Sequence, residues 1–228
     1  MTGVPHPLDR PIWNALHTKQ ASLALGGPQA MKFVPEIAAF ADTLDDGDAS
    51  LAALAQLIPE DGFVYLVRAD EHPIPPGTFA EKTAIAVQMI AESFVGTPHP
   101  EEIEPLGPPD IAEMMALTAL TEPGPFFART HELGQFWGVR ENGRLAAMAG
   151  ERLKLPGLTE LSGVCTHPDF RGRGYAALLS KAVCSLIVAR GETPFLHCYA
   201  DNAGAIALYE RLGFRIRARM NVTVLRRT

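Results

Sequence analysis

The chain has 228 residues, of which 47% are hydrophobic and 20% charged, and its formal net charge is −6; this composition is typical of a globular protein with a substantial core. No run approaches the roughly 20 apolar residues of a membrane span, and the N-terminus lacks a signal-peptide pattern. Three cysteines without a CxxC pair predict a reduced, cytoplasmic protein with neither a disulfide framework nor a metal site.

The first third of the chain predicts an α+β mixture. The expected elements are helices over about residues 11–25 and 49–57 and strands near residues 31–34 and 63–67. Asp45-Asp46-Gly47-Asp48 predicts a turn, and either Asp48 or Ser50 is expected to cap the helix that follows. The proline-rich stretch over residues 72–77 is the first candidate boundary.

The middle of the chain predicts a meander of antiparallel strands. A strand over residues 84–90 and a polar segment over residues 96–109 precede a helix that runs from Asp110 to about Leu120. Three strands are then expected over residues 136–140, 144–151 and 159–166, with a hairpin turn at Glu141-Asn142-Gly143. These strands lead directly into a glycine-rich loop.

The last part of the chain alternates helix and strand. The expected elements are a helix over residues 177–190 stopped by Gly191, a strand over 194–199, a helix from Asn202 to Leu212, and a final strand pair over 215–225.

Charge is distributed unevenly along the chain. Residues 1–110 contain 5 basic and 16 acidic side chains, whereas residues 111–228 contain 15 basic and 10 acidic ones. A basic C-terminal half suits an anionic ligand, and an acidic N-terminal half would attract a cationic one. Neutralisation of one half by the other across an interface is the alternative, and the sequence leaves both open.

The loop Arg171-Gly172-Arg173-Gly174 lies between a predicted strand and a predicted helix. Free N–H groups at a helix N-terminus, two glycines and two arginines predict a phosphate site. A P-loop is excluded because GxxxxGK[ST] does not occur. The Rossmann pattern GxGxxA is formally present, but about fifty residues follow it, too few for a doubly wound sheet.

Two segments together resemble the GNAT superfamily of N-acetyltransferases. In ELSGVCTHPDFRGRGYAALL, Arg171, Gly174 and Ala176 match the family's [Q/R]-x-x-G-x-[G/A] signature. In FLHCYADNAGAIALYERLGF, a strand, an asparagine and a tyrosine-bearing helix precede Gly-Phe, as in the family's second segment. The resemblance covers roughly residues 85–228, and residues 1–84 match poorly.

The resemblance implies an α/β (α+β) fold with a mixed central sheet, in which parallel strands four and five splay apart. Those strands correspond to residues 159–166 and 194–199. It also divides the chain into a smaller α+β segment over residues 1–84, interpreted as a degenerate half of the fold, and an acetyltransferase domain over residues 85–228.

The resemblance further implies where acetyl-CoA binds. Backbone groups exposed by the splay would pair with the pantetheine amides, and amides of the glycine-rich loop would bind the pyrophosphate. The residues assigned to the cofactor in this way are Gly163, Val164, Cys165, Thr166, Arg171, Gly172, Arg173, Gly174, Tyr175, Ala176, Asn202 and Tyr209. Cys165 is interpreted as a small core residue rather than a nucleophile, because no histidine can be assigned to activate it.

Two residues are candidates for acid–base catalysis. Glu160 lies eleven positions before Arg171, a spacing at which several family members carry a glutamate base. The alternative is a solvated or salt-bridged strand residue, and Glu151 is the reserve. Tyr209 occupies the family's tyrosine position, where a phenol would protonate the departing thiolate. The alternative for Tyr209 is packing on an amphipathic helix, and Asn202 is also expected to cap its helix.

The sequence therefore predicts an N-acetyltransferase that moves an acyl group directly from acetyl-CoA to the amine of a small molecule or peptide. A non-catalytic acyl-CoA sensor is the alternative, and a Rossmann-type NAD(P) oxidoreductase is disfavoured. No basic stripe with interleaved aromatic residues indicates nucleic-acid binding, and no feature indicates a membrane partner or an oligomeric state.

Overall fold

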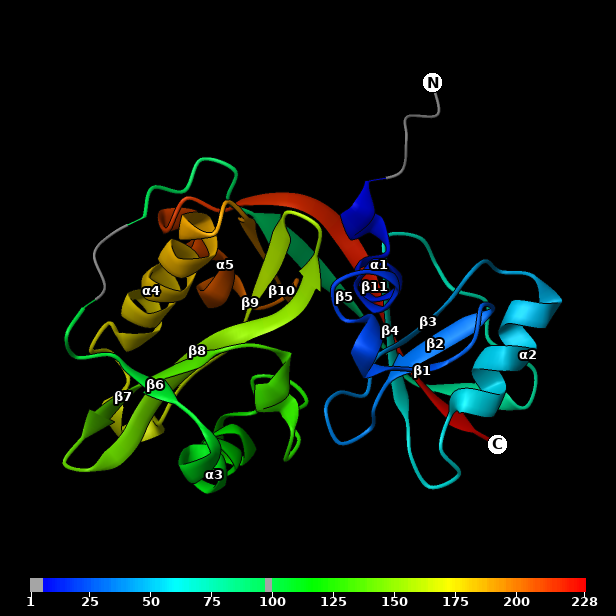
Figure 1. Ribbon diagram of the computed structural model, residues 1–228, viewed down its shortest axis with the longest axis horizontal. Helices are drawn as coiled ribbons and strands as arrows, with labels where there is room; N and C mark the ends of the chain where they lie inside the picture. Colours follow the sequence, from blue (N-terminus) through cyan, green and yellow to red (C-terminus); the bar gives the residue numbers. More distant parts are fainter. Residues whose placement is uncertain (1–5, 97–99) are drawn as a thin grey trace.

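The computed structural model describes residues 6–96 and 100–228, which form two β-sheets with helices packed against them (Figure 1). The large sheet has eight strands in the order β4-β11-β5-β10-β9-β8-β7-β6, and the small antiparallel sheet has the order β1-β2-β3. The strands are β1 (Ala24–Gly26), β2 (Ala30–Phe33), β3 (Ala41–Thr43), β4 (Val64–Arg68), β5 (Thr78–Ile90), β6 (Glu104–Leu106), β7 (Phe136–Glu141), β8 (Arg144–Leu155), β9 (Leu158–Thr166), β10 (Thr193–Tyr199) and β11 (Arg215–Arg227). The α-helices are α1 (Pro11–His17), α2 (Asp48–Leu57), α3 (Ile111–Thr121), α4 (Tyr175–Ala189) and α5 (Ala203–Arg211).

Local sequence signals explain the elements around the glycine-rich loop. The β7–β8 hairpin turns at Asn142 and Gly143, whose φ angles of 51° and 80° are those of a two-residue hairpin turn. Helix α4 ends before Gly191, which has φ 75° and adopts the left-handed conformation that commonly stops a helix. Asn202 caps α5 by accepting a hydrogen bond from the Ala205 N–H at 3.1 Å, as predicted.

Tertiary contacts override the predicted pattern in the first third of the chain. Helix α1 ends at His17 instead of residue 25, and the buried Gln20 side chain bonds to the Arg152 carbonyl at 2.8 Å and the Lys154 N–H at 3.1 Å. The predicted caps of α2 are wrong as well: Gly47 is the N-cap residue.

The predicted strand pair at the end of the chain is wrong. Residues 215–227 form the single strand β11, which pairs with β5 along one edge and with β4 along the other. Strand β5 starts at Thr78, six residues before the predicted start, because the long β11 offers partners as far as Arg227. Residues 97–99 of the predicted polar segment lie outside the described residues.

Both parts of the predicted domain division contribute to the large sheet. Strand β5 runs through the predicted boundary at residue 84, and β4 pairs with β11 in a register that places Val67 opposite Val222. The strands β5 and β11 thus connect the two regions of the molecule (Figure 1). The division of the chain into folding units stays a prediction.

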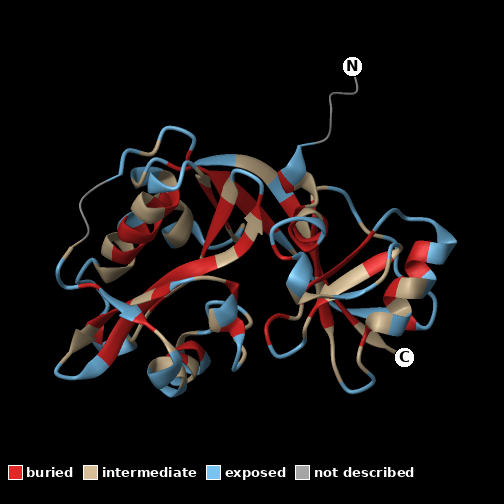
Figure 2. Cartoon of the chain, viewed as in Figure 1, coloured by how far each residue is buried: buried red, intermediate tan, exposed pale blue. Residues whose placement is uncertain are grey.

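Side chains alternate across the large sheet and build a core on each face. On β5, Val87 and Met89 pack with α4 and α5, whereas Ala86 and Ile90 pack with α1. On β8, Met148 packs with α3. Since neighbouring strand residues point to opposite faces, α4 and α5 cover one face while α1 and α3 cover the other, and the buried residues follow the strands (Figure 2).

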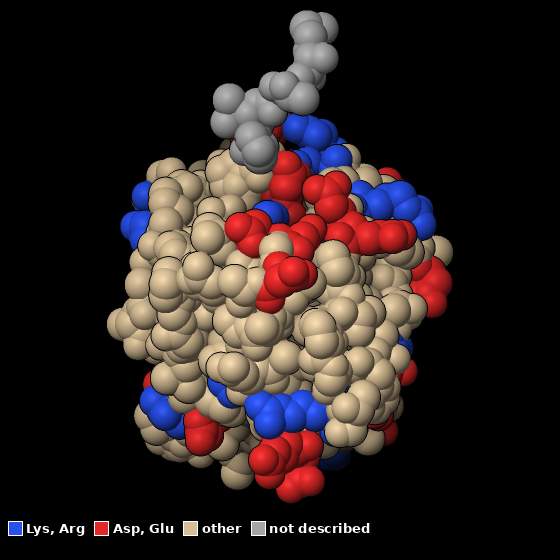
Figure 3. Space-filling view, turned by 90° about the vertical axis from the view of Figure 1, so that its right-hand side faces the viewer, with Lys and Arg blue, Asp and Glu red and all other residues tan. Residues whose placement is uncertain are grey.

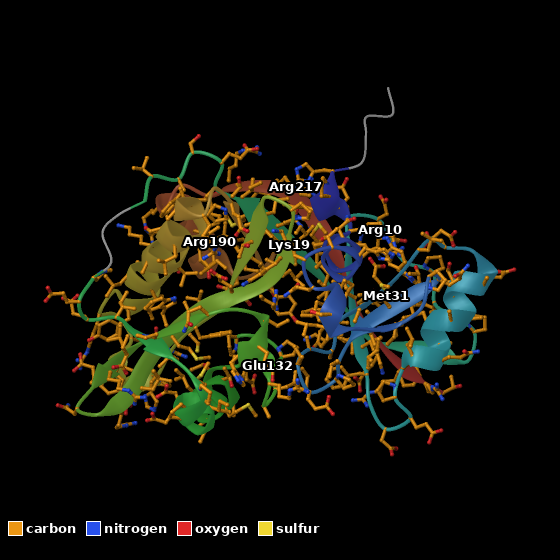
Figure 4. All side chains as sticks on the ribbon, viewed as in Figure 1. Arg10, Lys19, Met31, Glu132, Arg190 and Arg217 are labelled. Atoms are coloured by element: carbon orange, nitrogen blue, oxygen red, sulfur yellow. The ribbon has the colours of Figure 1, made fainter. Side chains whose placement is uncertain are left out.

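Ion pairs between the two halves account for part of the uneven charge. Acidic residues from the first half pair with arginines from the second in the pairs Asp9–Arg217, Glu81–Arg226, Glu92–Arg215, Glu104–Arg140 and Asp110–Arg140 (Arg217 is labelled in Figure 4). On the side of the molecule where α2 lies, charged side chains gather in separate groups with an uncharged area between them (Figure 3). These contacts favour mutual neutralisation over an acidic surface that attracts the acceptor.

In the part of the chain that the structure describes, no helix is both long enough and apolar enough to cross a membrane.

Candidate active site

Strands β9 and β10 are paired only where they begin. Their parallel register joins Thr193 to Leu158, Pro194 to Thr159 and Phe195 to Glu160, and no pair follows. Each strand stays paired on its other side, β9 with β8 as far as Thr166 and β10 with β5 as far as Tyr199. The mixed sheet and this separation confirm the predicted fold, and the facing edges keep N–H and C=O groups that a ligand can pair with.

A glycine shapes the free edge of β9. Gly163 has φ 63°, and a Cβ there would lie 2.8 Å from Cε1 of Phe136. The β8–β9 register shifts at the same place, between the pairs Met148–Cys165 and Gly150–Ser162, which marks a β-bulge. A side chain at residue 163 would therefore clash with Phe136 in the core. The bulge bends β9 in the part of the strand that is no longer paired with β10.

The gap between the separated strands opens into a cleft of about 860 Å³. The free part of β9, the glycine-rich loop, the first turn of α4, the end of β10 and helix α5 line one end of it. At the other end, Phe40, Tyr65 and Val67 come from the N-terminal region. Every residue that the sequence assigned to the cofactor lines this cleft: Gly163, Val164, Cys165, Thr166, Arg171, Gly172, Arg173, Gly174, Tyr175, Ala176, Asn202 and Tyr209.

The glycine-rich loop presents open space and unpaired N–H groups to the cleft. Gly172 and Gly174 have φ angles of 79° and 83°, and a Cβ at either would meet no atom within 4 Å. Gly174 is the N-cap of α4 and has no side chain to bond the N–H groups of the first turn. Arg173 pairs with Glu141 at 3.3 Å, whereas Arg171 has no ion pair within the described residues. These features fit an elongated ligand that carries phosphates.

Tyr209 lines the cleft from α5. Its residue is 8% exposed, its ring packs at 5.9 Å from that of Phe214, and among the residues described here nothing hydrogen-bonds to its hydroxyl. Burial, with the neighbouring Cys198 and Cys184, raises the pKa of the phenol above its ordinary value. The phenol is therefore protonated at neutral pH and has a free hydrogen to donate.

Glu160 does not line the cleft, and both oxygens of its carboxylate accept hydrogen bonds from protein groups. It is fully buried, and it accepts two hydrogen bonds from Arg152 at 2.6 and 2.8 Å and one from the Leu153 N–H at 3.2 Å. His197 Nδ1 lies 2.7 Å from its Oε1. Burial by itself would raise the pKa of this carboxyl, but Arg152 and His197 outweigh burial and lower the pKa to about 2. This geometry argues against the predicted role of Glu160 as the base.

The contacts of His197 decide its tautomer. Gln88 Oε1 accepts from Arg217, and Gln88 Nε2 donates to the Leu8 carbonyl at 2.9 Å. The amide nitrogen of Gln88 therefore faces His197 Nε2, at 2.9 Å. Because an amide nitrogen only donates, Nε2 must accept and Nδ1 must carry the proton that Glu160 receives. Both ring nitrogens are thus occupied, and His197 holds Glu160 in place.

Two further candidates from the sequence are buried and have partners within the protein. Glu151, the reserve base, is buried and pairs with Lys154 at 2.8 Å and with Arg190 at 2.7 Å (Arg190 is labelled in Figure 4). Cys165 is buried in the cluster beneath α3, and burial raises the pKa of its thiol to about 11. This thiol stays protonated at neutral pH, as expected of a core residue.

The sequence did not reveal the residues at the second end of the cleft. Phe40 and Tyr65 precede the region that resembles a known family, and Arg152 stacks over the Phe40 ring at 4.9 Å. Glu122 also lines the cleft, from the loop after α3. One signal was available for Glu122: it follows the predicted helix, which ends at about Leu120, and it precedes Pro123-Gly124-Pro125, so it was expected in a loop, where functional side chains are frequent.

Comparisons with known proteins agree with this geometry. Residues 136–223 match the family model described as FR47-like protein. A solved structure from Novosphingobium aromaticivorans, assigned to the GNAT family of acetyltransferases, is 44% identical with a TM-score of 0.93, over 98% of this chain and 100% of that one. A GCN5-related N-acetyltransferase from Kribbella flavida has a TM-score of 0.58 at 16% identity, over 88% of this chain and 87% of that one, which is a likeness of fold alone.

Curated relatives match a shorter region. The ribosomal protein bS18-alanine N-acetyltransferase of Escherichia coli K12 is 37% identical over 77 residues, which are 33% of this chain and 51% of that protein. The corresponding protein of Salmonella typhimurium is 40% identical over 72 residues, 31% of this chain and 48% of that protein. The chain thus spans about half the length of the curated relatives it matches.

Proposed function

Because the chain belongs to the GNAT family of acetyltransferases, we propose that it transfers an acetyl group from acetyl-CoA directly to a primary amine. The observation that carries the proposal is one continuous cleft lined by the free edge of β9, the glycine-rich loop and Tyr209. A thioester arm, a pyrophosphate and a proton donor for a leaving thiolate require these three features.

The chain's own groups supply the binding and the charge stabilisation. Unpaired backbone groups between Leu161 and Thr166 bind the pantetheine amides, and an N–H of this edge polarises the thioester carbonyl as negative charge develops on its oxygen. The N–H groups that open α4, together with Arg171, bind the pyrophosphate. The Tyr209 hydroxyl donates to the sulfur as the carbon–sulfur bond breaks.

The acceptor is an amine that enters from the end lined by Phe40 and Tyr65. The curated relatives are named for acetylating an alanine of a ribosomal protein, which supports a protein or peptide amine as one acceptor class. A small-molecule amine is the other class, and the aromatic walls suit an acceptor with an apolar body beside the amine.

Turnover of acetyl-CoA with a pooled library of amines and peptides tests this function. We expect release of free CoA thiol together with an acetylated product that mass spectrometry identifies. Thermal stabilisation by acetyl-CoA without thiol release on any amine would instead indicate an acyl-CoA sensor. Stabilisation by NAD(H) and not by acetyl-CoA would contradict the assignment of the glycine-rich loop.

Replacing Tyr209 with phenylalanine should slow the chemical step about 100-fold while leaving acetyl-CoA binding intact. The ring and its contact with Phe214 remain, but the thiolate loses its proton donor. Single-turnover kinetics measure the step, and isothermal titration measures the affinity for acetyl-CoA. An unchanged single-turnover rate would mean that the thiolate leaves without this proton.

A further inference from the structure

We propose that Glu122 binds the ammonium group of the acceptor and takes its proton before acyl transfer, an inference that rests on the proposed acetyltransferase activity. The acceptors that this assigns to the site are amines that carry a positive charge at neutral pH. Glu122 takes the role for which the sequence nominated Glu160, whose carboxylate is saturated and buried away from the cleft.

The end of α3 packs against the part of β9 that is not paired with β10. Thr121, the last residue of α3, donates its hydroxyl to the Leu117 carbonyl at 2.7 Å and hydrogen-bonds with the Cys165 thiol. The following residues Pro123 to Pro125 lie beside Arg152 and Gly163. Glu122 is therefore held between two fixed contacts at the place where the strands separate.

The backbone of Glu122 is in a conformation that glutamate rarely adopts. Its φ and ψ angles of 47° and 51° are left-handed, and its N–H donates to the Thr118 carbonyl at 2.8 Å as the C-cap of α3. Among the described residues other than glycine, only Asn142 shares a positive φ, and asparagine at a hairpin turn favours it. Glycine would close α3 with less strain.

The charge of Glu122 is also unfavourable at the C-terminus of α3. The C-terminus of a helix carries partial negative charge, so a carboxylate there is unfavourable. Glu122 is exposed and lines the cleft although it opposes both the backbone preference and the helix dipole; this is the pattern expected where function outweighs stability. The unusual residue at this position therefore indicates a role in the cleft.

Glu122 carries the one carboxylate among the described residues that line the cleft, and within the described chain this carboxylate has no hydrogen-bond or ion-pair partner. From the strands packed against α3, β8 presents Arg152 and β9 presents the Cys165 thiol. The charge of Arg152 is already balanced by Glu160. Across the cleft, His197 and Tyr209 are neutral as described above, so an entering ammonium finds its counter-charge at Glu122.

The proton transfers balance as follows. The acceptor ammonium gives one proton to the Glu122 carboxylate, and the amine nitrogen then forms a bond to the thioester carbon. The carbon–sulfur bond breaks, and its electron pair stays on sulfur. The thiolate takes the proton of Tyr209, which regains one from the nitrogen as the amide forms, while Glu122 releases its proton to solvent. The net products are the N-acetyl amide, the CoA thiol and one proton.

The test is Glu122→Gln, measured on acceptors that the library screen identifies. We expect kcat/KM at pH 7 to fall about 100-fold, with a contribution from KM because the ammonium loses its partner. The defect should shrink as the pH approaches the pKa of the acceptor, where the amine arrives already neutral. Between two acceptors, the one with the lower amine pKa should lose less.

Two controls separate the outcomes. Glu60→Gln removes an exposed carboxylate in the turn after α2 that does not line the cleft, and it should leave the rate unchanged. Glu122→Gly should raise the melting temperature, because glycine relieves the left-handed strain, while showing the same loss of rate. A wild-type rate in Glu122→Gln would overturn the inference. An absence of transfer by the wild-type protein to any amine would instead overturn the proposed function.

Discussion

Replacing Glu160 with alanine should lower the free energy of unfolding by about 3–5 kcal/mol. The substitution leaves the Arg152 guanidinium buried without its counter-charge, and it removes the partner of His197 Nδ1. The loss of stability should include the contact between His197 and Gln88, because Glu160 holds the His197 ring that Gln88 contacts. Chemical denaturation followed by circular dichroism measures the change.

The matched control is Glu132→Ala. Glu132 forms the same two-bond contact with Arg129, at 2.6 and 2.8 Å, but on the surface (Glu132 is labelled in Figure 4). Water replaces the lost partner there, so this variant should unfold close to wild type. Equal losses in the two variants would mean that burial does not set the strength of the Arg152–Glu160 pair.

The buried Arg152–Glu160 ion pair predicts that the free energy of unfolding depends on pH at acidic values. The pKa of Glu160 is lowered to about 2 in the folded protein from an ordinary value of 4.5, so its contribution is fully present above pH 4.5. The contribution is lost as the pH falls from 4.5 toward 2, because in this interval Glu160 is protonated in the unfolded chain but still ionised in the folded protein. Glu160→Gln should flatten the stability profile in this interval. An unchanged profile would contradict the low pKa.

Replacing Gly174 with valine should weaken acetyl-CoA binding about 100-fold or more, a loss of about 3 kcal/mol. A Cβ at residue 174 projects into the space of the cleft where no protein atom lies within 4 Å. In the proposed complex, the backbone approaches the pyrophosphate in this space. Isothermal titration with acetyl-CoA, and the thermal shift that it produces, measure the effect.

Gly157→Val is the control for backbone strain. Gly157 has φ 73°, and a Cβ there also meets no atom within 4 Å, but it lies in the β8–β9 turn outside the cleft. Both variants should lose similar stability without ligand, since both place valine in a left-handed conformation. Only Gly174→Val should lose the stabilisation by acetyl-CoA, and an equal response in both would remove the glycine-rich loop from the binding site.

The sequence alone determined the end of the cleft that the glycine-rich loop lines. The loop from Arg171 to Gly174, the start of α4 and the cap at Asn202 are all local features, in which each residue acts on backbone groups a few positions away. Spacing along the chain is then enough to place them. For the same reason the β7–β8 hairpin and the strands on either side of the loop were found close to their predicted bounds.

The tertiary structure decided which carboxylate is free. Whether Glu160 is a base or half of an ion pair depends on Arg152 from β8 and on His197 from β10, and no spacing within β9 reveals either. The same holds for Phe40 and Tyr65, which reach the cleft because β4 pairs with β11 at the far end of the chain. Such contacts depend on strand order and register, which are set by long-range burial of apolar side chains, whereas turns and caps are set by neighbouring residues.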